Sequence, residues 1–415
     1  LELRLHNRCM TSKLPRSFNF LAFANLGAQS AEQLSLAAVP LVAVIALGAG
    51  PGEIGFLAAI QTLPFLLLSI PLGLLADRMP RRRLMIIAEV LRALSLFGLL
   101  AAILLSQLSI GLLAVLGFIG AVGTVGFSVT APASVPALVP HDALASANGR
   151  LELARSTAFA AGPALAGALV AWAGASAAFV LAAILSTAAV VLLFKLAEPA
   201  RSSPAKRHPL LELQDGAKLV WNDPLLRPIL YTSVAWNIAW FVLQATYIPY
   251  AIRALGLSAS VVGLTLATYG FGMIVGSILA PRIIAALPFG RAVQVGPAFS
   301  VAAAFAMVLT LVFPTAAMAA FAFFLFGVGP IIWTITSMTL RQTVTPSAML
   351  GRVSALFITV SMGARPIGAA LGGYVGATWG EPACLLLSLA GFGVQAWIIF
   401  ASKVSQLQKL PATVN

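Results

Sequence analysis

The chain has 415 residues, of which 60% are hydrophobic and only 9% are charged. Soluble globular domains carry about a quarter charged residues, so this composition excludes a soluble fold and makes lipid the solvent for most of the surface. The formal net charge of +13 comes from 25 Lys and Arg residues against 12 Asp and Glu residues. The two cysteines, Cys9 and Cys384, lie far apart in the sequence and cannot by themselves form a disulfide framework or a metal site.

Twelve apolar stretches are each long enough to cross a bilayer, which takes about 20 helical residues. They lie at residues 17–47, 52–76, 84–106, 109–139, 148–173, 175–196, 226–252, 258–281, 292–313, 315–340, 352–378 and 382–402. Leu, Ala, Gly and Phe fill them without strict alternation, which predicts helices and not barrel strands. The first stretch is too long for a signal peptide, and no cleavage pattern follows it. We therefore predict an all-α membrane protein with twelve transmembrane helices.

The positive charges test this topology. With the N-terminus inside, only Arg253 among the 25 Lys and Arg residues falls outside, and three lie within spans (Arg92, Arg155 and Arg365). Cytoplasmic loops carry the excess of Lys and Arg, so the pattern predicts that both termini are cytoplasmic. We expect a multi-pass protein of a bacterial cytoplasmic (inner) membrane. The net charge is then explained by topology, and we expect no nucleic-acid partner.

Three short patterns recur in order at an offset of about 203 residues. They are Leu75-Ala-Asp-Arg78 with Leu279-Ala-Pro-Arg282, Gly149-Arg150 with Gly351-Arg352, and Pro163 with Pro366. Such a parallel repeat predicts two six-helix pseudo-symmetric halves, with a substrate site near the midplane where the halves meet. We expect the N-terminal half over 1–196, a polar and basic cytoplasmic linker over 197–223, and the C-terminal half over 224–415.

The loop after the second span places one carboxylate among arginines. Its residues are Gly73, Asp77, Arg78, Arg81, Arg82 and Arg83. This pattern resembles the cytoplasmic signature loop of the major facilitator superfamily, with Pro80 where that pattern has a second glycine. The resemblance implies a gating loop, in which Asp77 holds neighbouring helix ends together until the halves rearrange. Gly73 would permit close approach of helices. The alternative is that the arginines only orient the chain.

The fifth span carries a second resemblance. Gly149, Ala158, Gly162, Pro163, Ala166 and Gly167 are similar to the antiporter motif of the same superfamily, which has glycines in place of the two alanines. Gly-Pro within a helix removes a backbone hydrogen bond and bends the helix, and small residues allow tight packing. The resemblance implies export by antiport. The alternative is a kink that serves packing alone.

Further segments resemble the enterobactin-exporter and macrolide-efflux subgroup of this superfamily. They are Pro136-Ala-Leu-Val-Pro140, Ala147-Asn148, His208-Pro-Leu and Thr345-Pro-Ser-Ala-Met-Leu-Gly351-Arg352. They cover both halves, so the fold of the major facilitator superfamily is implied for the whole chain. They do not identify the substrate.

Ionisable residues within the spans are functional candidates, because a charge at the centre of a membrane helix costs about 2.5–3.5 kcal/mol. Glu32 lies in the first span, and the spacing places Asn25, Gln29 and Glu32 on one helical face. The resemblance implies that the first span lines the cavity. Glu32 is then the candidate for proton coupling or for contact with a cationic substrate. The alternative is a structural, hydrogen-bonded glutamate.

Other charges within the spans have possible partners three residues away. Glu89 with Arg92, and Glu152 with Arg155, can pair along their own helices. Glu152 could instead join the charges of the gating loop. Arg365 has no acidic neighbour in its span, so contact with an anionic substrate group and interhelical pairing both stay open.

Aromatic and amide side chains mark the seventh span. Trp236, Trp240, Gln244 and Tyr247 follow helical spacing on one face, and Trp333 lies in the tenth span. Such a wall suits an amphipathic ligand, which it binds by stacking and a few hydrogen bonds. The alternatives are an interfacial aromatic belt and plain packing.

The sequence lacks the patterns of an enzyme or a nucleotide-driven pump. Neither HExxH nor GxxxxGK[ST] occurs, and we expect no cofactor and no metal. An ion gradient is then the expected energy source. We predict a monomeric, lipid-embedded secondary transporter that exports a siderophore or another amphipathic small molecule in exchange for protons. The alternatives are a multidrug or macrolide efflux pump, and a non-transporting sensor or lipid scramblase on the same fold.

Overall fold

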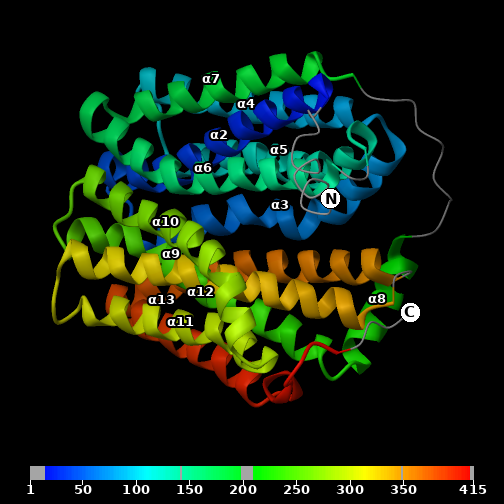
Figure 1. Cartoon of the computed structure of the whole chain (residues 1–415). Coiled ribbons are helices and arrows are strands. Elements are labelled where there is room, and N and C mark those ends of the chain that lie inside the picture. The colour runs from blue at the N-terminus through cyan, green and yellow to red at the C-terminus, as the bar shows by residue number, and fades with distance from the viewer. Residues whose placement is uncertain (1–14, 141–142, 198–208, 347–348, 412–415) are drawn as a thin grey trace, which may run out of the picture.

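The computed structural model describes residues 15–140, 143–197, 209–346 and 349–411, and nearly all of them are helical. The first half consists of α2 (Arg16–Leu47), α3 (Pro51–Arg78), α4 (Arg81–Leu104), α5 (Ile110–Leu138), α6 (Leu144–Ala173) and α7 (Ala175–Phe194). The second consists of α9 (Leu226–Arg253), α10 (Ala259–Ala286), α11 (Phe289–Leu309), α12 (Ala316–Val344) and α13 (Leu350–Phe400). The two groups lie against each other (Figure 1).

The twelve predicted spans are confirmed. Ten helices of the described residues are long and apolar enough to cross a membrane. Helix α13 counts once among them but contains 51 residues, a length of about 77 Å, and a break at Gly380 divides it into two passes. Helix α9 is not among the ten, although its 28 residues could span a bilayer. Its Trp, Tyr, Asn and Gln side chains lower its hydropathy.

Glycine turns gather at one end of the bundle, which we call the glycine-turn end. Gly48, Gly174, Gly256 and Gly380 all have positive φ there, a conformation that side chains disfavour. Gly174 (φ 81°, ψ 176°) and Gly380 (φ 81°, ψ 174°) adopt the same conformation after the fifth and eleventh spans. This match is a structural counterpart of the repeat in the sequence, and it supports two related halves.

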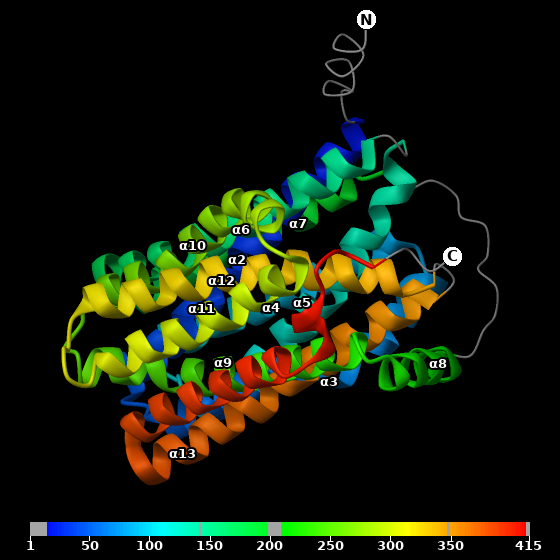
Figure 2. The ribbon, with the colours of Figure 1, turned by 60° about the horizontal axis from the view of Figure 1, so that its bottom comes forward.

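The opposite end, which we call the basic end, carries Arg81, Arg82, Arg83, Arg150 and helix α8 (Pro209–Asn222) (Figures 1 and 2). Helix α8 occupies the second part of the predicted linker, where the sequence predicted only a polar segment. Its Asp215 pairs with Arg352 at the start of α13 at 3.1 Å. The first part of the linker, residues 198–208, lies outside the described residues, and the proposed boundaries of the halves stay a prediction.

The halves meet through two tight helix crossings near the glycine-turn end. In the first, α3 packs on α13 so closely that a Cβ on Gly55 would lie 2.3 Å from the Cα of Gly373. In the second, α6 packs on α10, and a Cβ on Gly167 would lie 2.4 Å from the carbonyl oxygen of Ala259. Small residues allow membrane helices to approach in this way. Arg253 adds a polar contact, donating to the carbonyl oxygens of Gly48 and Ala49 at 2.6 and 2.8 Å.

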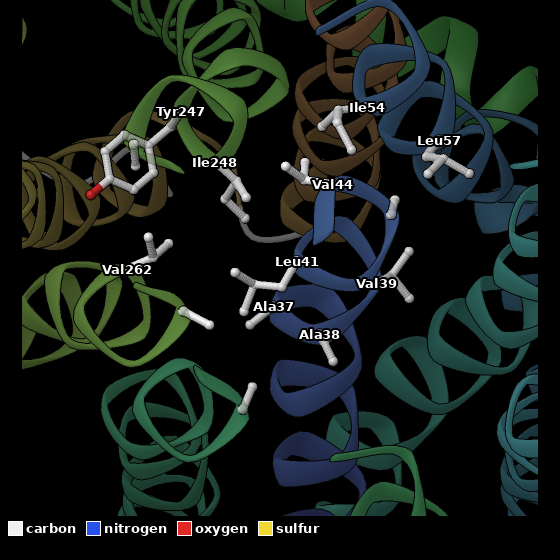
Figure 3. Close-up of a cluster of buried hydrophobic side chains, with 14 of the residues drawn as sticks. Ala37, Ala38, Val39, Leu41, Val44, Ile54, Leu57, Tyr247, Ile248 and Val262 are labelled. Carbon is white, nitrogen blue, oxygen red and sulfur yellow. The ribbon is translucent and has the colours of Figure 1, made fainter. Parts of the chain in front are cut away.

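Apolar side chains fill the space between the halves at this end (Figure 3). Leu41 and Val44 of α2 belong to the same buried cluster as Ile54 of α3, Ile248 of α9 and Val262 of α10. The outer surface is also apolar, as a surface in contact with lipid requires, with side chains such as Phe23, Leu94 and Trp172 exposed. We conclude that the halves are joined and sealed at the glycine-turn end.

The Gly55 crossing predicts a specific stability defect. Gly55→Ala places a methyl group against backbone atoms, which cannot move aside easily, and overpacking of this kind costs about 1–3 kcal/mol. Gly111→Ala is the matched control, because nothing lies within 4 Å of a Cβ at Gly111. Thermal unfolding of the purified variants in detergent should show a lower midpoint for Gly55→Ala alone. Equal midpoints for the two variants would contradict the close crossing.

Candidate functional site

A cavity of about 550 Å³ lies between the two halves, within the size range of small-molecule sites. Helices α2 to α6 line it from one half, and α9, α10, α12 and α13 line it from the other. Its chemically distinctive residues are Glu32, Gln61, Arg92, Arg155, Trp236, Asn237, Trp240, Gln244, Tyr269, Trp333 and Arg365. The cavity therefore combines charges, amides and a large aromatic surface.

A charge cluster on the N-terminal side of the cavity is centred on Arg92. The Arg92 guanidinium lies 2.7 Å from Glu89 and 3.9 Å from Glu32. The pairing of Glu89 with Arg92 that the sequence predicted is confirmed. The approach of Arg92 to Glu32 was not predicted, because it joins two different helices. Glu89 is fully buried, whereas the Glu32 side chain keeps 19% exposure and lines the cavity.

Neutral groups complete the cluster. Arg92 donates to the carbonyl oxygen of Ala28 and to the Thr124 hydroxyl, both at 2.9 Å. The Ser186 hydroxyl donates to Glu89 at 2.9 Å. One guanidinium thus lies between two carboxylates, and Glu89 makes the closer contact with it. Glu32 is the more loosely held of the two carboxylates and the one that faces the cavity.

Two polar residues expected beside Glu32 do not line the cavity. On α2 the cavity wall runs from Glu32 to Pro40, and Asn25 and Gln29 lie one to two turns closer to the basic end. Asn25 is buried and donates to the carbonyl oxygen of Leu151, so it joins α2 to α6. Gln29 is half-buried. The expectation that the three residues form one polar face of the cavity is wrong for Asn25 and Gln29.

Arg155 lines the cavity from α6, while its partner Glu152 does not. The two side chains lie 2.5 Å apart, and Glu152 is 53% exposed. The predicted pair along the helix is present. The Arg155 guanidinium also lies 5.6 Å from the ring centre of Phe159, close enough for a cation–π contact.

Arg365 reaches the cavity from α13. Its Nε donates to Oδ1 of Asn237 on α9 at 3.1 Å. Its guanidinium lies 5.5 Å from the ring centre of Phe65 and 5.4 Å from that of Phe241. Within the described part of the chain, no carboxylate lies within 4 Å of it. Arg365 therefore bonds across helices, through an amide, and also lines the cavity, and its contact with an anionic substrate group stays a prediction.

Aromatic rings of the C-terminal half form part of the cavity wall. Trp236 and Trp240 stack with ring centres 5.3 Å apart and planes 11° from parallel. Tyr269 follows at 5.1 Å from Trp240. Gln244 and Trp333 also line the cavity, as predicted from the sequence.

The sequence predicted Tyr247 in this wall, but its side chain is buried in the core. It has no exposed surface, shares a 2.5 Å hydrogen bond with Thr265, and packs edge-on against Phe323. The cavity face of α9 advances four residues at a time through Trp236, Trp240 and Gln244, and its next member is Ile248. One residue of helix turns the side chain by about 100°, which directs Tyr247 into the core.

The gating loop contacts helix ends through its arginines. Arg81 donates to the carbonyl oxygen of Ala133 near the end of α5. Arg82 donates to the carbonyl oxygens of Leu193, at 3.0 Å, and of Phe194, the last two residues of α7. Cations at helix C-termini satisfy free carbonyl groups and interact favourably with the helix dipole. These arginines therefore do more than orient the chain.

Three other residues of the loop belong to the predicted latch. Arg78 is exposed, and the side chain of Asp77 lies outside the described residues. A Cβ on Gly73 would lie 3.8 Å from Val129, an ordinary contact, so the expected close helix approach at Gly73 is wrong for this arrangement of the helices. The latch at Asp77 stays a prediction.

The Gly-Pro segment of α6 packs on both halves. A Cβ on Gly162 would lie 2.5 Å from Cβ of Gln33 on α2, and Gly167 forms the crossing with α10. Pro163 lies between them and lines the cavity. The segment thus joins the wall of the cavity to a crossing between the halves.

The Arg92 cluster predicts a non-additive effect on stability. Arg92→Met leaves the buried Glu89 carboxylate without its counter-ion, which costs about 3–5 kcal/mol. The double variant Glu89→Leu with Arg92→Met removes both charges and should recover much of this loss. Arg155→Met is the control, because its exposed pair should contribute only about 0–1 kcal/mol. Denaturant unfolding in detergent measures all three. A double variant as unstable as Arg92→Met would contradict the pairing.

Comparisons with known proteins agree with this arrangement. A model of the Major Facilitator Superfamily matches residues 21–369. An uncharacterized MFS-type transporter, y4rN, of Sinorhizobium fredii is 30% identical over 58% of this chain, and the match spans 59% of that relative's length. The enterobactin exporter EntS of Citrobacter koseri is 28% identical over 78% of this chain and 76% of its own length.

Solved structures share the fold. A bacterial homologue of the iron transporter ferroportin, in an inward-facing state, aligns with a TM-score of 0.74 at 17% identity, covering 94% of this chain and 99% of that one. A bacterial homologue of the human lysosomal transporter Spinster aligns with a TM-score of 0.74 at 14% identity, covering 95% and 98%. At these identities the likeness concerns the fold alone.

Proposed function

The chain belongs to the Major Facilitator Superfamily and is a membrane transporter, not an enzyme, and from this premise we propose that it is a proton-coupled exporter of a siderophore or another amphipathic small molecule. The observation that carries the proposal is the cavity between the halves. Glu32, a loosely held carboxylate, lines it from the N-terminal half, and a stack of aromatic rings and the cation Arg365 line it from the C-terminal half. A carboxylate can exchange a proton, while rings and a cation can hold an amphipathic ligand.

Alternating access is the proposed mechanism. The two tight crossings and the Arg253 contact all join the halves near the glycine-turn end. Rocking of the halves would exchange this closed end for a closed basic end, with the cavity between them. Arg81 and Arg82 join the loop between α3 and α4 to α5 and α7 of its own half, so we propose that this loop moves with that half. In this scheme Asp77 is the proposed latch.

Glu32 is the proposed coupling group. Its contact with Arg92 is 3.9 Å long, whereas Glu89 supplies Arg92 with a closer partner at 2.7 Å. Arg92 therefore stays compensated when Glu32 takes up a proton. One proton moving down 100 mV yields about 2.3 kcal/mol, enough for roughly fifty-fold accumulation of a neutral substrate.

The remaining assignments follow from the same premise. Because basic residues collect at one end of the bundle, we place that end, with both chain termini, on the cytoplasmic side of a bacterial inner membrane. We propose a monomer in lipid, with the cavity formed within one chain. The siderophore as cargo is suggested by the enterobactin exporter of Citrobacter koseri, which is similar over both halves.

Transport into inverted membrane vesicles tests direction and coupling together. Vesicles containing the protein should accumulate a radiolabelled siderophore when the interior is acidified. A protonophore that collapses the gradient should abolish this uptake, because the proton supplies the driving force. Vesicles without the protein are the control. Uptake that continues after the gradient collapses would contradict proton antiport.

The role of Glu32 is tested by Glu32→Gln, which keeps the shape and removes the exchangeable proton. We expect loss of proton-driven accumulation in the same vesicles. Glu53→Gln is the matched control, because Glu53 lies at the glycine-turn end and accepts a 2.8 Å hydrogen bond from the Gly50 amide, which glutamine can also accept. Accumulation by Glu32→Gln at the wild-type level would remove Glu32 from the mechanism.

A further inference from the structure

Arg365 is distinguished from the other cations of the cavity by its lack of a counter-ion. Arg92 lies between Glu89 and Glu32, and Arg155 contacts Glu152. Arg365 has no carboxylate within 4 Å among the residues that the structure describes. A charge within a membrane protein that has no carboxylate in contact with it is costly, so its retention points to a function.

The hydrogen bonds around Arg365 fix which part of its guanidinium is free. The Asn237 amide donates through Nδ2 to the carbonyl oxygen of Ser233 at 2.9 Å, which leaves Oδ1 to accept from Nε of Arg365. One turn away, the hydroxyls of Ser233 and Ser361 share a 2.8 Å hydrogen bond. These two bridges hold α13 against α9. Since Nε is occupied, the terminal Nη groups remain as a fork of donors.

Two phenylalanine rings hold the guanidinium in place. Phe241 comes from α9 in the same half, and Phe65 comes from α3 in the other half. Contacts with ring faces stabilise a cation and leave the edge of the guanidinium, where its N–H groups lie, open to a ligand. A planar fork of this kind matches a carboxylate with two parallel hydrogen bonds.

The neighbouring stripe of α9 supplies a stacking surface. Asn237 and Phe241, which contact Arg365, each follow directly after Trp236 and Trp240 in the sequence. The two tryptophans are stacked on each other and line the cavity. The indole N–H of Trp236 is buried without an acceptor in the described part of the chain. Trp240 is buried between Trp236 and Tyr269, whereas Trp236 is only half-buried. The positive fork and the Trp236 ring thus line the same cavity.

We propose that Arg365 and the Trp236–Trp240 stack form a subsite for an aromatic anion, a planar ring that carries a carboxylate or phenolate group. The anionic group binds the Nη fork of Arg365, and the ring lies against Trp236, the more exposed ring of the stack. This subsite names the substrate class of the transporter and rests on the proposed function. It makes Arg365 a binding residue and Asn237 a positioning residue.

Small probes of matched size separate charge from aromaticity. Isothermal titration calorimetry on the detergent-purified full chain should detect benzoate, with weaker binding of cyclohexanecarboxylate, which has the charge but no aromatic ring, and of benzyl alcohol, which has the ring but no charge. Quenching of tryptophan fluorescence should accompany benzoate binding. Equal affinity for benzoate and benzyl alcohol would overturn the assignment.

Variants test the named residues. Arg365→Gln should weaken benzoate binding by about tenfold to a hundredfold, because it removes the charge-assisted pair. Arg365→Lys keeps the charge but lacks the fork, so it should bind more weakly than the wild type and more tightly than Arg365→Gln. Arg282→Gln, an exposed arginine of α10, is the control and should bind benzoate normally.

The outcomes separate this inference from the proposed function. If Arg365→Gln is not monodisperse in gel filtration, Arg365→Lys decides, and unchanged benzoate affinity in that variant overturns the subsite. If proton-driven transport proceeds in vesicles but benzoate neither binds nor competes with the cargo, the subsite fails and the exporter stands. If benzoate binds through Arg365 but no cargo moves under a proton gradient, the subsite stands and the proposed function fails.

Discussion

An ionised side chain within a membrane bundle must be compensated, and this constraint organises the N-terminal half. Arg92 of α4 is the counter-ion of both Glu89 and Glu32, with a contact of 2.7 Å to Glu89 and a longer one of 3.9 Å to Glu32. The carbonyl oxygen of Ala28 on α2 and the Thr124 hydroxyl of α5 also accept hydrogen bonds from Arg92. One guanidinium thereby fixes the relative positions of three helices, and it leaves a single carboxylate directed at the cavity.

The C-terminal half meets the same constraint differently. Arg365 is held by an amide and two aromatic rings in place of a carboxylate. These groups position a cation without neutralising it. The halves share their helix order and the conformation of Gly174 and Gly380, yet the N-terminal half presents Glu32 with Arg92 and Arg155 to the cavity, whereas the C-terminal half presents Arg365. The two halves thus share their fold, and they differ in the charged side chains that line the cavity.

Sequence reasoning succeeded where a periodicity or a local spacing determines the result. Apolar length predicted the twelve spans, and three-residue spacing predicted the Glu89–Arg92 pair. It failed where a contact joins elements that are distant in the chain. No period in the sequence connects Glu32 with Arg92, or Gly55 with Gly373. At Tyr247 the spacing of three residues was compatible with the cavity face, but the pitch of α9 favoured Ile248.

Glu32 and Arg365 lie in different halves, and this placement has a consequence for the coupling of proton and substrate movement. A ligand shifts a conformational equilibrium only by contacts that differ between the two states. Arg365 contacts Phe65 across the boundary of the halves, so rocking must change the surroundings of this cation. Glu32 and Arg365 line the same cavity from different halves, so rocking also changes the distance between them. In the proposed mechanism, a proton on Glu32 and an anion on Arg365 would therefore act on one motion from different halves, without touching each other.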